Sequence, residues 1–193
     1  MIKIIDDFFS DPWTMRAMAL ESEKWERPED VHYYTASLSQ EEYFETSGIK
    51  KRIEDEVGCE LVTHSAGFRL NTIHNTTWVH TDHPAADYSI IIYLNPNPPV
   101  DHGTTFLTHK EYGNMSGRVN IDVAGNTLMS KYITSDMSQW KVVDVIGNVF
   151  NRCVIMNSKY WHKPTYAGFG YDKHTGRLTF SAFLKIKNDT HNR

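Results

Sequence analysis

Cysteine is scarce in this chain of 193 residues, which contains only Cys59 and Cys153. Two cysteines that lie far apart in the sequence do not form the disulfide framework on which small secreted domains depend. We therefore expect two reduced thiols and a cytoplasmic protein. Residues 1–7 turn acidic too early for a signal peptide, which agrees with this expectation.

Long apolar runs and basic stretches are also missing. No apolar run approaches the roughly 20 residues that a membrane-spanning helix needs, so we expect no membrane partner. The formal net charge is −4. The Lys/Arg run Lys50–Arg52 is short and acids flank it, so the electrostatic footprint of a protein that binds nucleic acid is absent.

The length and composition fit one domain over residues 1–193, because 40% of the chain is hydrophobic and 12% is aromatic. Ser10-Asp11-Pro12 is typical of a helix start, since it combines a capping side chain, an early acid and an early proline. Residues 39–57 also suggest helix, and Gly58 is a suitable C-terminal stop.

Apolar residues in these two segments recur at helical spacing. One predicted face consists of Trp13, Ala17 and Leu20. A second consists of Ile49, Ile53 and Val57. We therefore predict that residues 1–59 form a helical support that packs against the rest of the chain.

From residue 60 onward, short apolar or alternating segments are separated by turn-forming residues. The predicted strands are Glu60–Val62, Gly67–Ile73, Tyr88–Leu94, Thr104–Thr108, Val142–Ile146, Arg152–Met156 and Arg177–Ile186. Residues 110–140 are polar, so we interpret them as an insertion on a β core of residues 60–186, with a short helix at Leu128–Ile133. The predicted fold class is mainly β with N-terminal helices (α+β), arranged as a sandwich or barrel.

One short motif has the chemistry of a metal site. In His80-Thr-Asp82, an imidazole and a carboxylate at positions i and i+2 point to the same side of an extended segment. His162, which follows the apolar segment 153–156, is the best candidate for a third ligand. Two histidines and one carboxylate suit non-haem Fe(II) and leave three coordination positions open. The alternative is a polar surface turn with solvated side chains.

The last predicted strand has an unusual polar face. Arg177, Thr179 and Ser181 share one side of it, and Leu178 and Phe180 share the other. A guanidinium that points into a barrel is costly unless an anion pairs with it. A substrate carboxylate is a suitable partner, because arginine binds carboxylates through two parallel hydrogen bonds. The alternative is a surface arginine or an ordinary salt bridge.

The order of several short motifs resembles one enzyme family, the Fe(II)/2-oxoglutarate-dependent oxygenases, and in particular their prolyl-hydroxylase-like branch. The motifs that carry the resemblance are Ile4-Ile-Asp-Asp-Phe-Phe9, His80-Thr-Asp82, Tyr93-Leu94-Asn95, Gly103-Thr-Thr-Phe106, Asn151-Arg-Cys-Val-Ile-Met156, His162 and Arg177. They cover most of the chain except residues 110–140.

This resemblance implies a double-stranded β-helix, a jelly roll of the cupin-like type. It implies that His80, Asp82 and His162 bind Fe(II), and that Arg177 binds the distal carboxylate of 2-oxoglutarate. Tyr93, with Ser181 or Thr179, would help to bind that carboxylate, and Asn71 is a candidate for the other end of the cosubstrate. O2 would be the co-reactant and ascorbate a candidate reductant. Asp82 disfavours halogenation, because halogenating relatives have a small residue there.

The resemblance is thinnest at residues 110–140 and between His162 and Arg177, where the gap is longer than in compact members. The resemblance implies hydroxylation of a peptidyl (prolyl-like) or small-molecule substrate. Because the resemblance is thinnest in these two segments, it does not define which substrate. Two other classes stay open. A cupin-type protein would use the same metal ligands without 2-oxoglutarate, with His83, His102 and His109 also available. A non-catalytic binding module is the other.

Overall fold

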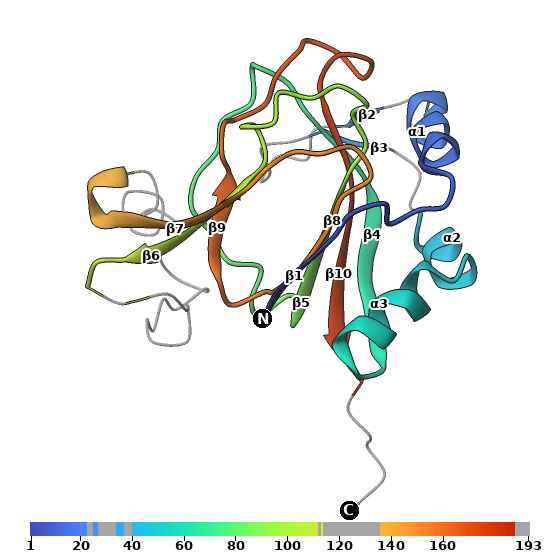
Figure 1. Cartoon of the computed structure of the whole chain (residues 1–193), viewed down its shortest axis with the longest axis horizontal. Helices are drawn as coiled ribbons and strands as arrows, with labels where there is room; N and C mark the ends of the chain where they lie inside the picture. The colour runs from blue at the N-terminus through green and yellow to red at the C-terminus, as the bar shows by residue number, and fades with distance from the viewer. Residues whose placement is uncertain (23–24, 27–33, 37–39, 112, 114–135, 188–193) are drawn as a thin grey trace, which may run out of the picture.

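The computed structural model describes residues 1–22, 25–26, 34–36, 40–111, 113 and 136–187, and it is mainly β with a few helices near the N-terminus (Figure 1). Within these described ranges, all strand pairings are antiparallel, and the strands form a seven-stranded and a three-stranded sheet. The large sheet has the order β1 (Ile2–Ile5), β8 (Cys153–Asn157), β5 (Tyr88–Tyr93), β10 (Arg177–Ile186), β4 (Leu61–Asn71), β3 (Tyr34–Ala36) and β2 (Trp25–Glu26). The predicted mainly β class with N-terminal helices is confirmed.

The small sheet has the order β7 (Trp140–Ile146), β6 (Thr104–His109) and β9 (Trp161–Pro164), and a short 3-10 helix, η2 (Met137–Gln139), precedes β7. It lies on the opposite side of the large sheet from the helices (Figure 1). The β6–β7 pair extends outward, and residues 141–145 of β7 are exposed. The two sheets therefore face each other mainly through β6 and β9.

Three helices cover the other face of the large sheet: α1 (Pro12–Glu21), α2 (Glu41–Thr46) and α3 (Ile49–Val57). The predicted start of α1 is confirmed, because the Asp11 side chain accepts hydrogen bonds from the backbone N–H groups of Trp13 and Thr14. The predicted stop at Gly58 is also confirmed, with a left-handed φ of 77°. Within the predicted helical segment 39–57, the described residues from 40 onward form the two helices α2 and α3.

The buried face of α1 differs from the prediction. Met15 and Ala19 are buried, whereas Trp13 is 59% exposed and Ala17 is also exposed. Trp13 instead packs its ring against Phe150, with 4.9 Å between centroids. The helical spacing of apolar residues in α1 is compatible with a buried face at Trp13 and Ala17 or at Met15 and Ala19. Contact with the sheet buries the second of these faces.

The main hydrophobic core lies between the helices and the large sheet. On β10, Leu178, Phe180, Ala182 and Leu184 point into this core and are fully buried. The matching side chains of β4 are Ala66, Phe68 and Leu70, which are also buried. The helices contribute Phe44, Ile49 and Ile53. This leaves the opposite face of both strands for the space between the sheets.

Two strands, β4 and β9, differ from the prediction. Glu60–Val62 and Gly67–Ile73 were predicted as separate strands, but β4 runs unbroken from Leu61 to Asn71 because it pairs with β10 along its whole length. Strand β9 was not predicted. The helix expected at Leu128–Ile133 lies outside the described residues.

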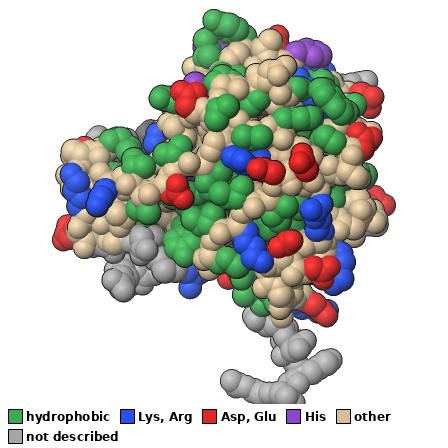
Figure 2. Space-filling model, in the orientation of Figure 1, with side chains coloured by type: hydrophobic (Ala, Val, Ile, Leu, Met, Phe, Trp, Pro, Cys, Tyr) green, Lys and Arg blue, Asp and Glu red, His purple; other side chains and the backbone are tan. Residues whose placement is uncertain are grey.

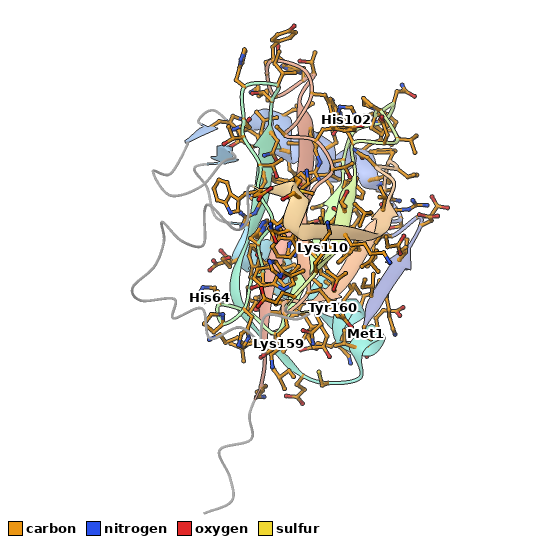
Figure 3. The ribbon with its side chains drawn as sticks, turned by 90° about the vertical axis from the view of Figure 1, so that its left-hand side faces the viewer. Met1, His64, His102, Lys110, Lys159 and Tyr160 are labelled. Carbon is orange, nitrogen blue, oxygen red and sulfur yellow. The ribbon has the colours of Figure 1, made fainter. Side chains whose placement is uncertain are left out.

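Met1 and His102 lie at opposite ends of the strands (Figure 3). The Met1 amino group donates a hydrogen bond of 2.9 Å to the Tyr160 hydroxyl near one end, and His102 lies toward the other end (Figure 3). On the face seen in Figure 2, acidic and basic side chains are mixed, and neither sign forms a continuous area. None of the described helices has the length and apolar character needed to cross a membrane.

Candidate metal centre

His80, Asp82 and His162 form one cluster in the structure, and one potential ligand atom from each lies within 4.8 Å of the others. Two backbone hydrogen bonds of 2.9 Å join His80 and His162 in a β-bridge, which sets the two rings side by side with centroids 4.5 Å apart. The Asp82 carboxylate lies 3.7 Å from Nε2 of His80 and 3.4 Å from Nε2 of His162. Residues far apart in sequence thus converge on one point.

The orientation of each imidazole is fixed by its other nitrogen. Nδ1 of His80 lies 3.2 Å from the Trp78 carbonyl, and Nδ1 of His162 lies 3.0 Å from the Tyr160 carbonyl. A carbonyl oxygen can only accept, so each Nδ1 carries the proton and donates it. Nε2 of each ring then faces Asp82 and is the nitrogen left to bind a metal. This is how metal-binding histidines are commonly oriented.

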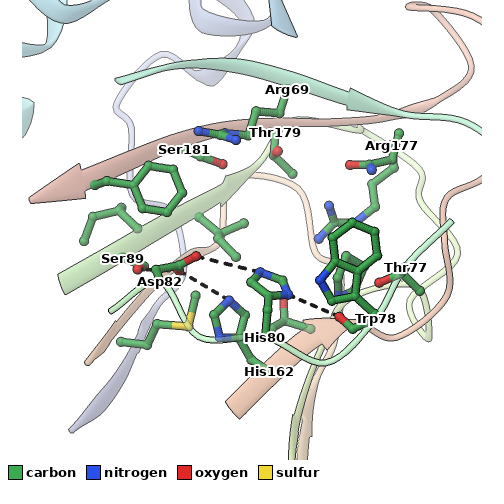
Figure 4. Close-up of a pocket in the computed structure, with 17 residues that line it drawn as sticks. Arg69, Thr77, Trp78, His80, Asp82, Ser89, His162, Arg177, Thr179 and Ser181 are labelled. Carbon is green, nitrogen blue, oxygen red and sulfur yellow. Dashed lines mark hydrogen bonds and ion pairs between the residues drawn. The ribbon is translucent and has the colours of Figure 1, made fainter. Parts of the chain in front are cut away.

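Asp82 is held by a buried chain of two hydroxyls, of which Figure 4 shows the first, Ser89. Ser89 donates a hydrogen bond of 2.6 Å to Oδ2 of Asp82, and Ser158 lies 2.8 Å from the Ser89 hydroxyl. The backbone N–H of Asp82 also donates to the Ser158 carbonyl, at 3.0 Å. The carboxylate therefore has one oxygen engaged with Ser89, and its other oxygen is available to a ligand.

Electrostatics favour the metal-binding form of His80. Although 38% of its side chain is exposed, the surrounding groups desolvate the ring, and this burial lowers the pKa of His80 to about 4. The charge on His162 lowers this pKa further, and Asp82 partly offsets the shift. His80 is thus neutral near pH 7, as a ligand must be. Two imidazole nitrogens and one carboxylate fit the donor set of a divalent transition metal such as Fe(II).

The cluster lies in a cavity of about 290 Å³ between the two sheets. This volume is at the lower end of the roughly 300–1,000 Å³ that is typical of ligand pockets. The large sheet contributes side chains from the non-core face of β4 and β10, and these are Arg69, Asn71, Arg177, Thr179, Ser181 and Phe183. Thr77 and Trp78 line it on the segment that leads to His80 (Figure 4).

Arg177 lies in this cavity, as its position on the polar face of β10 predicted, and it is 4% exposed. Its Nε donates to the His102 carbonyl at 3.2 Å, and its guanidinium lies 5.4 Å from the centre of the Tyr93 ring. Burial lowers the pKa of Arg177, and Tyr93 partly opposes that shift. Gly103, whose carbonyl also lies near this guanidinium, packs directly against the end of β7, because a Cβ there would stand 1.8 Å from the Ile146 carbonyl oxygen.

The other predicted cosubstrate residues divide into two groups. Thr179, Ser181 and Asn71 line the cavity. Tyr93 is fully buried behind it, where its hydroxyl lies 2.7 Å from the Thr104 hydroxyl. Tyr93 therefore contacts Arg177 and Thr104 from behind the cavity wall, and of the hydrogen-bonded pair Tyr93 and Thr104 it is Thr104 that lines the cavity.

Sequence reasoning missed Arg69, Ser89 and Ser158. The sequence could have placed Arg69 in the cavity, because Arg69 stands two residues before Asn71 and therefore lies on the same face of the strand. The two serines had none, because their role depends on contacts across the fold. Among the residues that the structure describes, the histidines considered for a cupin-type site lie outside the cluster. His102 bonds to Asp101 and His109 packs on Trp140.

The chain has the fold of the Fe/2-oxoglutarate-dependent oxygenases, which confirms the predicted resemblance at the level of the fold. The epimerase SnoN from nogalamycin biosynthesis, solved with Fe³⁺, α-ketoglutarate and nogalamycin RO, has a TM-score of 0.66 and 12% identity, covering 95% of this chain and 78% of its own. HygX from Streptomyces hygroscopicus, solved with nickel, 2-oxoglutarate and hygromycin B, has a TM-score of 0.60 and 14% identity, covering 100% of this chain and 85% of its own.

A prolyl hydroxylase from Trichoplax adhaerens, solved with a peptide fragment of the hypoxia-inducible factor, has a TM-score of 0.57 and 12% identity, covering 95% of this chain and 82% of its own. Residues 1–184 match the sequence model of a family of unknown function, DUF6445, and the chain belongs to this family. No curated protein matches the sequence.

Proposed function

We propose that this protein is an Fe(II)- and 2-oxoglutarate-dependent dioxygenase that hydroxylates a C–H bond. The observation that carries the proposal is the shared cavity. A His80–Asp82–His162 cluster with its Nε2 atoms directed at one point lies in the same small pocket as a buried arginine, Arg177. A metal site alone would need no buried guanidinium, and a structural arginine would need no metal ligands beside it.

The chain's own residues would then divide the work. His80, Asp82 and His162 hold Fe(II), and Ser89 keeps the Asp82 carboxylate in one orientation through its 2.6 Å hydrogen bond. Arg177 binds the distal carboxylate of 2-oxoglutarate. Its guanidinium has five N–H groups, and those not bonded to the His102 and Gly103 carbonyls or to the Tyr93 hydroxyl remain for an anion. Thr104 and Thr179 offer hydroxyls to the same carboxylate, with Tyr93 as support behind them.

Fe(II) would supply the chemistry of O2 reduction, in which 2-oxoglutarate, O2 and R–H give succinate, CO2 and R–OH. Ascorbate is a candidate reductant that keeps the iron as Fe(II). A carboxylate at position 82 fills the place that a halide would need, which favours hydroxylation. The proposal includes both a peptidyl and a small-molecule substrate, because proteins of similar fold were solved with a peptide and with hygromycin B.

The strand order supports the double-stranded β-helix as the finer description of the fold. Strands β8, β5, β10 and β4 lie consecutively in one sheet, and β7, β6 and β9 form the facing sheet. His80 pairs with His162 of β9 in an isolated antiparallel bridge, so the segment around His80 stands where a fourth strand of the small sheet would lie. We also propose that residues 1–193 form a single domain and that the protein is cytoplasmic.

The test is spectroscopic and needs no substrate. Protein loaded with Fe(II) and 2-oxoglutarate in the absence of O2 should develop the visible absorption band of an Fe(II)–2-oxo acid chelate, and calorimetry should detect 2-oxoglutarate binding that requires the metal. On exposure to O2, slow uncoupled release of succinate should follow. A cupin-type protein would bind the metal without 2-oxoglutarate, and a non-catalytic module would bind neither. Absence of both the band and 2-oxoglutarate binding would sink the proposal.

Variants separate the two halves of the site. His162→Ala should lose metal binding, and His64→Ala is the matched control because His64 is exposed on β4 outside the cluster. Arg177→Gln should keep the metal and weaken 2-oxoglutarate by about tenfold or more, since a charge-assisted contact is lost. An unchanged metal content in His162→Ala would move the third ligand elsewhere.

A further inference from the structure

Two backbone carbonyls hold the Arg177 guanidinium along one edge. Its Nε donates to the His102 carbonyl at 3.2 Å, and its Nη2 donates to the Gly103 carbonyl at 3.5 Å. The Tyr93 hydroxyl also bonds to the guanidinium. Because a guanidinium is planar and rigid, fixed acceptors on one edge determine the direction in which its other N–H groups point. The direction in which Arg177 meets an anion therefore depends on the placement of residues 102 and 103.

The His102 side chain is enclosed by the β9–β10 loop, which comprises residues 165–176. The His102 ring lies 4.5 Å from the Tyr166 ring and 5.6 Å from the Phe169 ring, measured between centroids, and the second pair is nearly perpendicular at 82°. Its Nδ1 also lies 2.9 Å from the Asp101 carboxylate. The His102 side chain is 23% exposed. Three side chains thus fix the residue whose carbonyl accepts the Nε hydrogen bond.

The β9–β10 loop is itself fixed to the rest of the fold. Figure 1 shows it at the end of the strands away from the N-terminus. Gly168 packs against the end of β4 so closely that a Cβ there would stand 2.6 Å from the Thr72 carbonyl oxygen. The Thr165 N–H donates at 3.1 Å to the Gly103 carbonyl, the same oxygen that Arg177 approaches. The loop therefore connects the large sheet to the carbonyls that hold the arginine.

A second histidine pairs with a tyrosine of the same loop in a different setting. The His74 and Tyr171 rings lie 5.9 Å apart, and both side chains are exposed, Tyr171 by 72%. The carbonyls that accept from the Arg177 guanidinium belong to His102 and Gly103. The two pairs are alike in chemistry and differ in their connection to Arg177, so the His74 pair is a matched control for the His102 pair.

We propose that His102 is a positioning residue for the cosubstrate, because its ring, held by Tyr166 and Phe169, fixes the carbonyl that orients Arg177. This inference rests on the proposed function, in which Arg177 binds the distal carboxylate of 2-oxoglutarate. An arginine held in one direction selects the length of the acid, since the distal carboxylate of a longer diacid arrives where the guanidinium does not turn to meet it. His102 thereby determines the preference for 2-oxoglutarate over longer 2-oxo diacids.

The experiment measures affinity by calorimetry on the Fe(II)-loaded protein in the absence of O2. Three ligands are compared: 2-oxoglutarate, 2-oxoadipate, which is one methylene longer, and oxalate, which offers the metal two oxygens and has no distal carboxylate. The unmodified protein should bind 2-oxoglutarate about tenfold or more tightly than 2-oxoadipate, because one methylene has an effect of this size at a rigid site.

Replacement of His102 should change length selection and leave the metal end intact. His102→Ala should weaken 2-oxoglutarate by about three- to tenfold, since it removes two aromatic contacts. It should reduce the preference over 2-oxoadipate to about threefold or less, because a guanidinium that turns accepts both lengths. Oxalate affinity should stay within about twofold. His102→Phe keeps the ring contacts and should bind 2-oxoglutarate within about twofold of the unmodified protein.

Variants of the loop test the same contact from its other side. Tyr166→Ala should act in the same direction as His102→Ala, and because the Tyr166 side chain is 50% exposed, it tests the inference even where His102→Ala does not fold. His74→Ala and Tyr171→Ala are the controls, and each should leave all three affinities within about twofold.

Four results would overturn the inference. The first is an unchanged 2-oxoglutarate affinity in His102→Ala or, where that variant does not fold, in Tyr166→Ala. The second is an equal loss of oxalate affinity, which would assign the effect to the metal centre. The third is a loss with an unchanged length preference, or one that His102→Phe shares. The fourth is an equal loss in either control. Failure of the proposed function looks different, because the unmodified protein would then show no metal-dependent binding of 2-oxoglutarate.

Discussion

The two faces of the large sheet are made by the same strands but have opposite chemistry. On β10, Leu178 and Phe180 face the helices, are fully buried and belong to the main hydrophobic core. The alternate residues Arg177, Thr179 and Ser181 face the small sheet and are also buried, with exposures of 4%, 2% and 4%. Burial alone therefore does not separate the core from the site.

What separates the two faces is the cost of burial. An apolar side chain is stabilised by leaving water, whereas a buried hydroxyl or guanidinium loses hydration and needs partners. Burial of the polar face of β10 and β4 therefore lowers the stability of the fold, and burial of the apolar face offsets this cost. Such a face is maintained where ligands complete its hydrogen bonds. The comparison makes the helix face the source of the folding energy, and under the proposed function the pocket face is the side that binds ligands.

The largest effect is expected on the helix face. Phe180→Ala should lower the free energy of unfolding by about 3–5 kcal/mol, because Phe180 is fully buried and its ring lies between those of Phe44 and Phe68. Urea denaturation followed by circular dichroism measures this loss. Phe183→Ala is the control on the same strand and the opposite face. It should cost less than about 2 kcal/mol, because its ring lies half-buried at the pocket wall. Equal losses would contradict the division of the two faces.

A smaller effect is expected from the hydroxyl that holds the metal ligand. Ser89→Ala removes the donor to Asp82 and should weaken metal binding by about 10–100-fold, as is usual for groups that orient a ligand. Competition with a chelator of known affinity measures this in the absence of O2. Ser158→Ala is the matched control, since the Ser158 hydroxyl contacts Ser89 and its role toward Asp82 is through the backbone. It should have a smaller effect, and an equal or larger one would argue against the direct role of Ser89.

The sequence was sufficient for the features that depend on local periodicity. The alternation along Arg177–Ile186 correctly separated the core side chains from those that line the cavity, because a strand allows only two directions. The same reasoning applied to His80 and Asp82, whose spacing put both on one side. His162 was different, because its place in the cluster depends on a bridge to His80 across the fold. Family resemblance was needed to select it among ten histidines.

The features that the sequence did not predict depend on tertiary contacts. β9 has only four residues, and its pairing with β6 holds it in an extended form. The middle of β4 has no strong strand pattern, and pairing with β10 makes it continuous. Trp13 fitted the spacing of a buried face and lies exposed, since the sheet contacts the side of α1 that carries Met15. Long-range pairing overrides local preference in each case.

The smallest effect is expected at the edge of the sheet, away from both faces. Arg152 of the turn before β8 forms a two-point ion pair with Asp6, which follows β1, at 2.6 and 2.9 Å. The hydrogen bond from Arg152 holds the pKa of Asp6 below its ordinary value of 3.8. Because the folded-state pKa is lowered, the stabilisation is present above pH 3.8 and is lost as the pH falls through the folded-state value.

Asp6→Asn should therefore lower the free energy of unfolding at pH 7 by less than about 1 kcal/mol, since the Asp6 side chain is 56% exposed and water screens the pair. Urea denaturation of both proteins between pH 7 and pH 3 measures the difference, which should shrink below pH 3.8 and also with added salt. Arg152 keeps its hydrogen bond to the Gly147 carbonyl in the variant, so the turn should hold its shape. A difference that stays constant down to pH 3 would show that packing, rather than charge, connects β1 to the edge of the sheet.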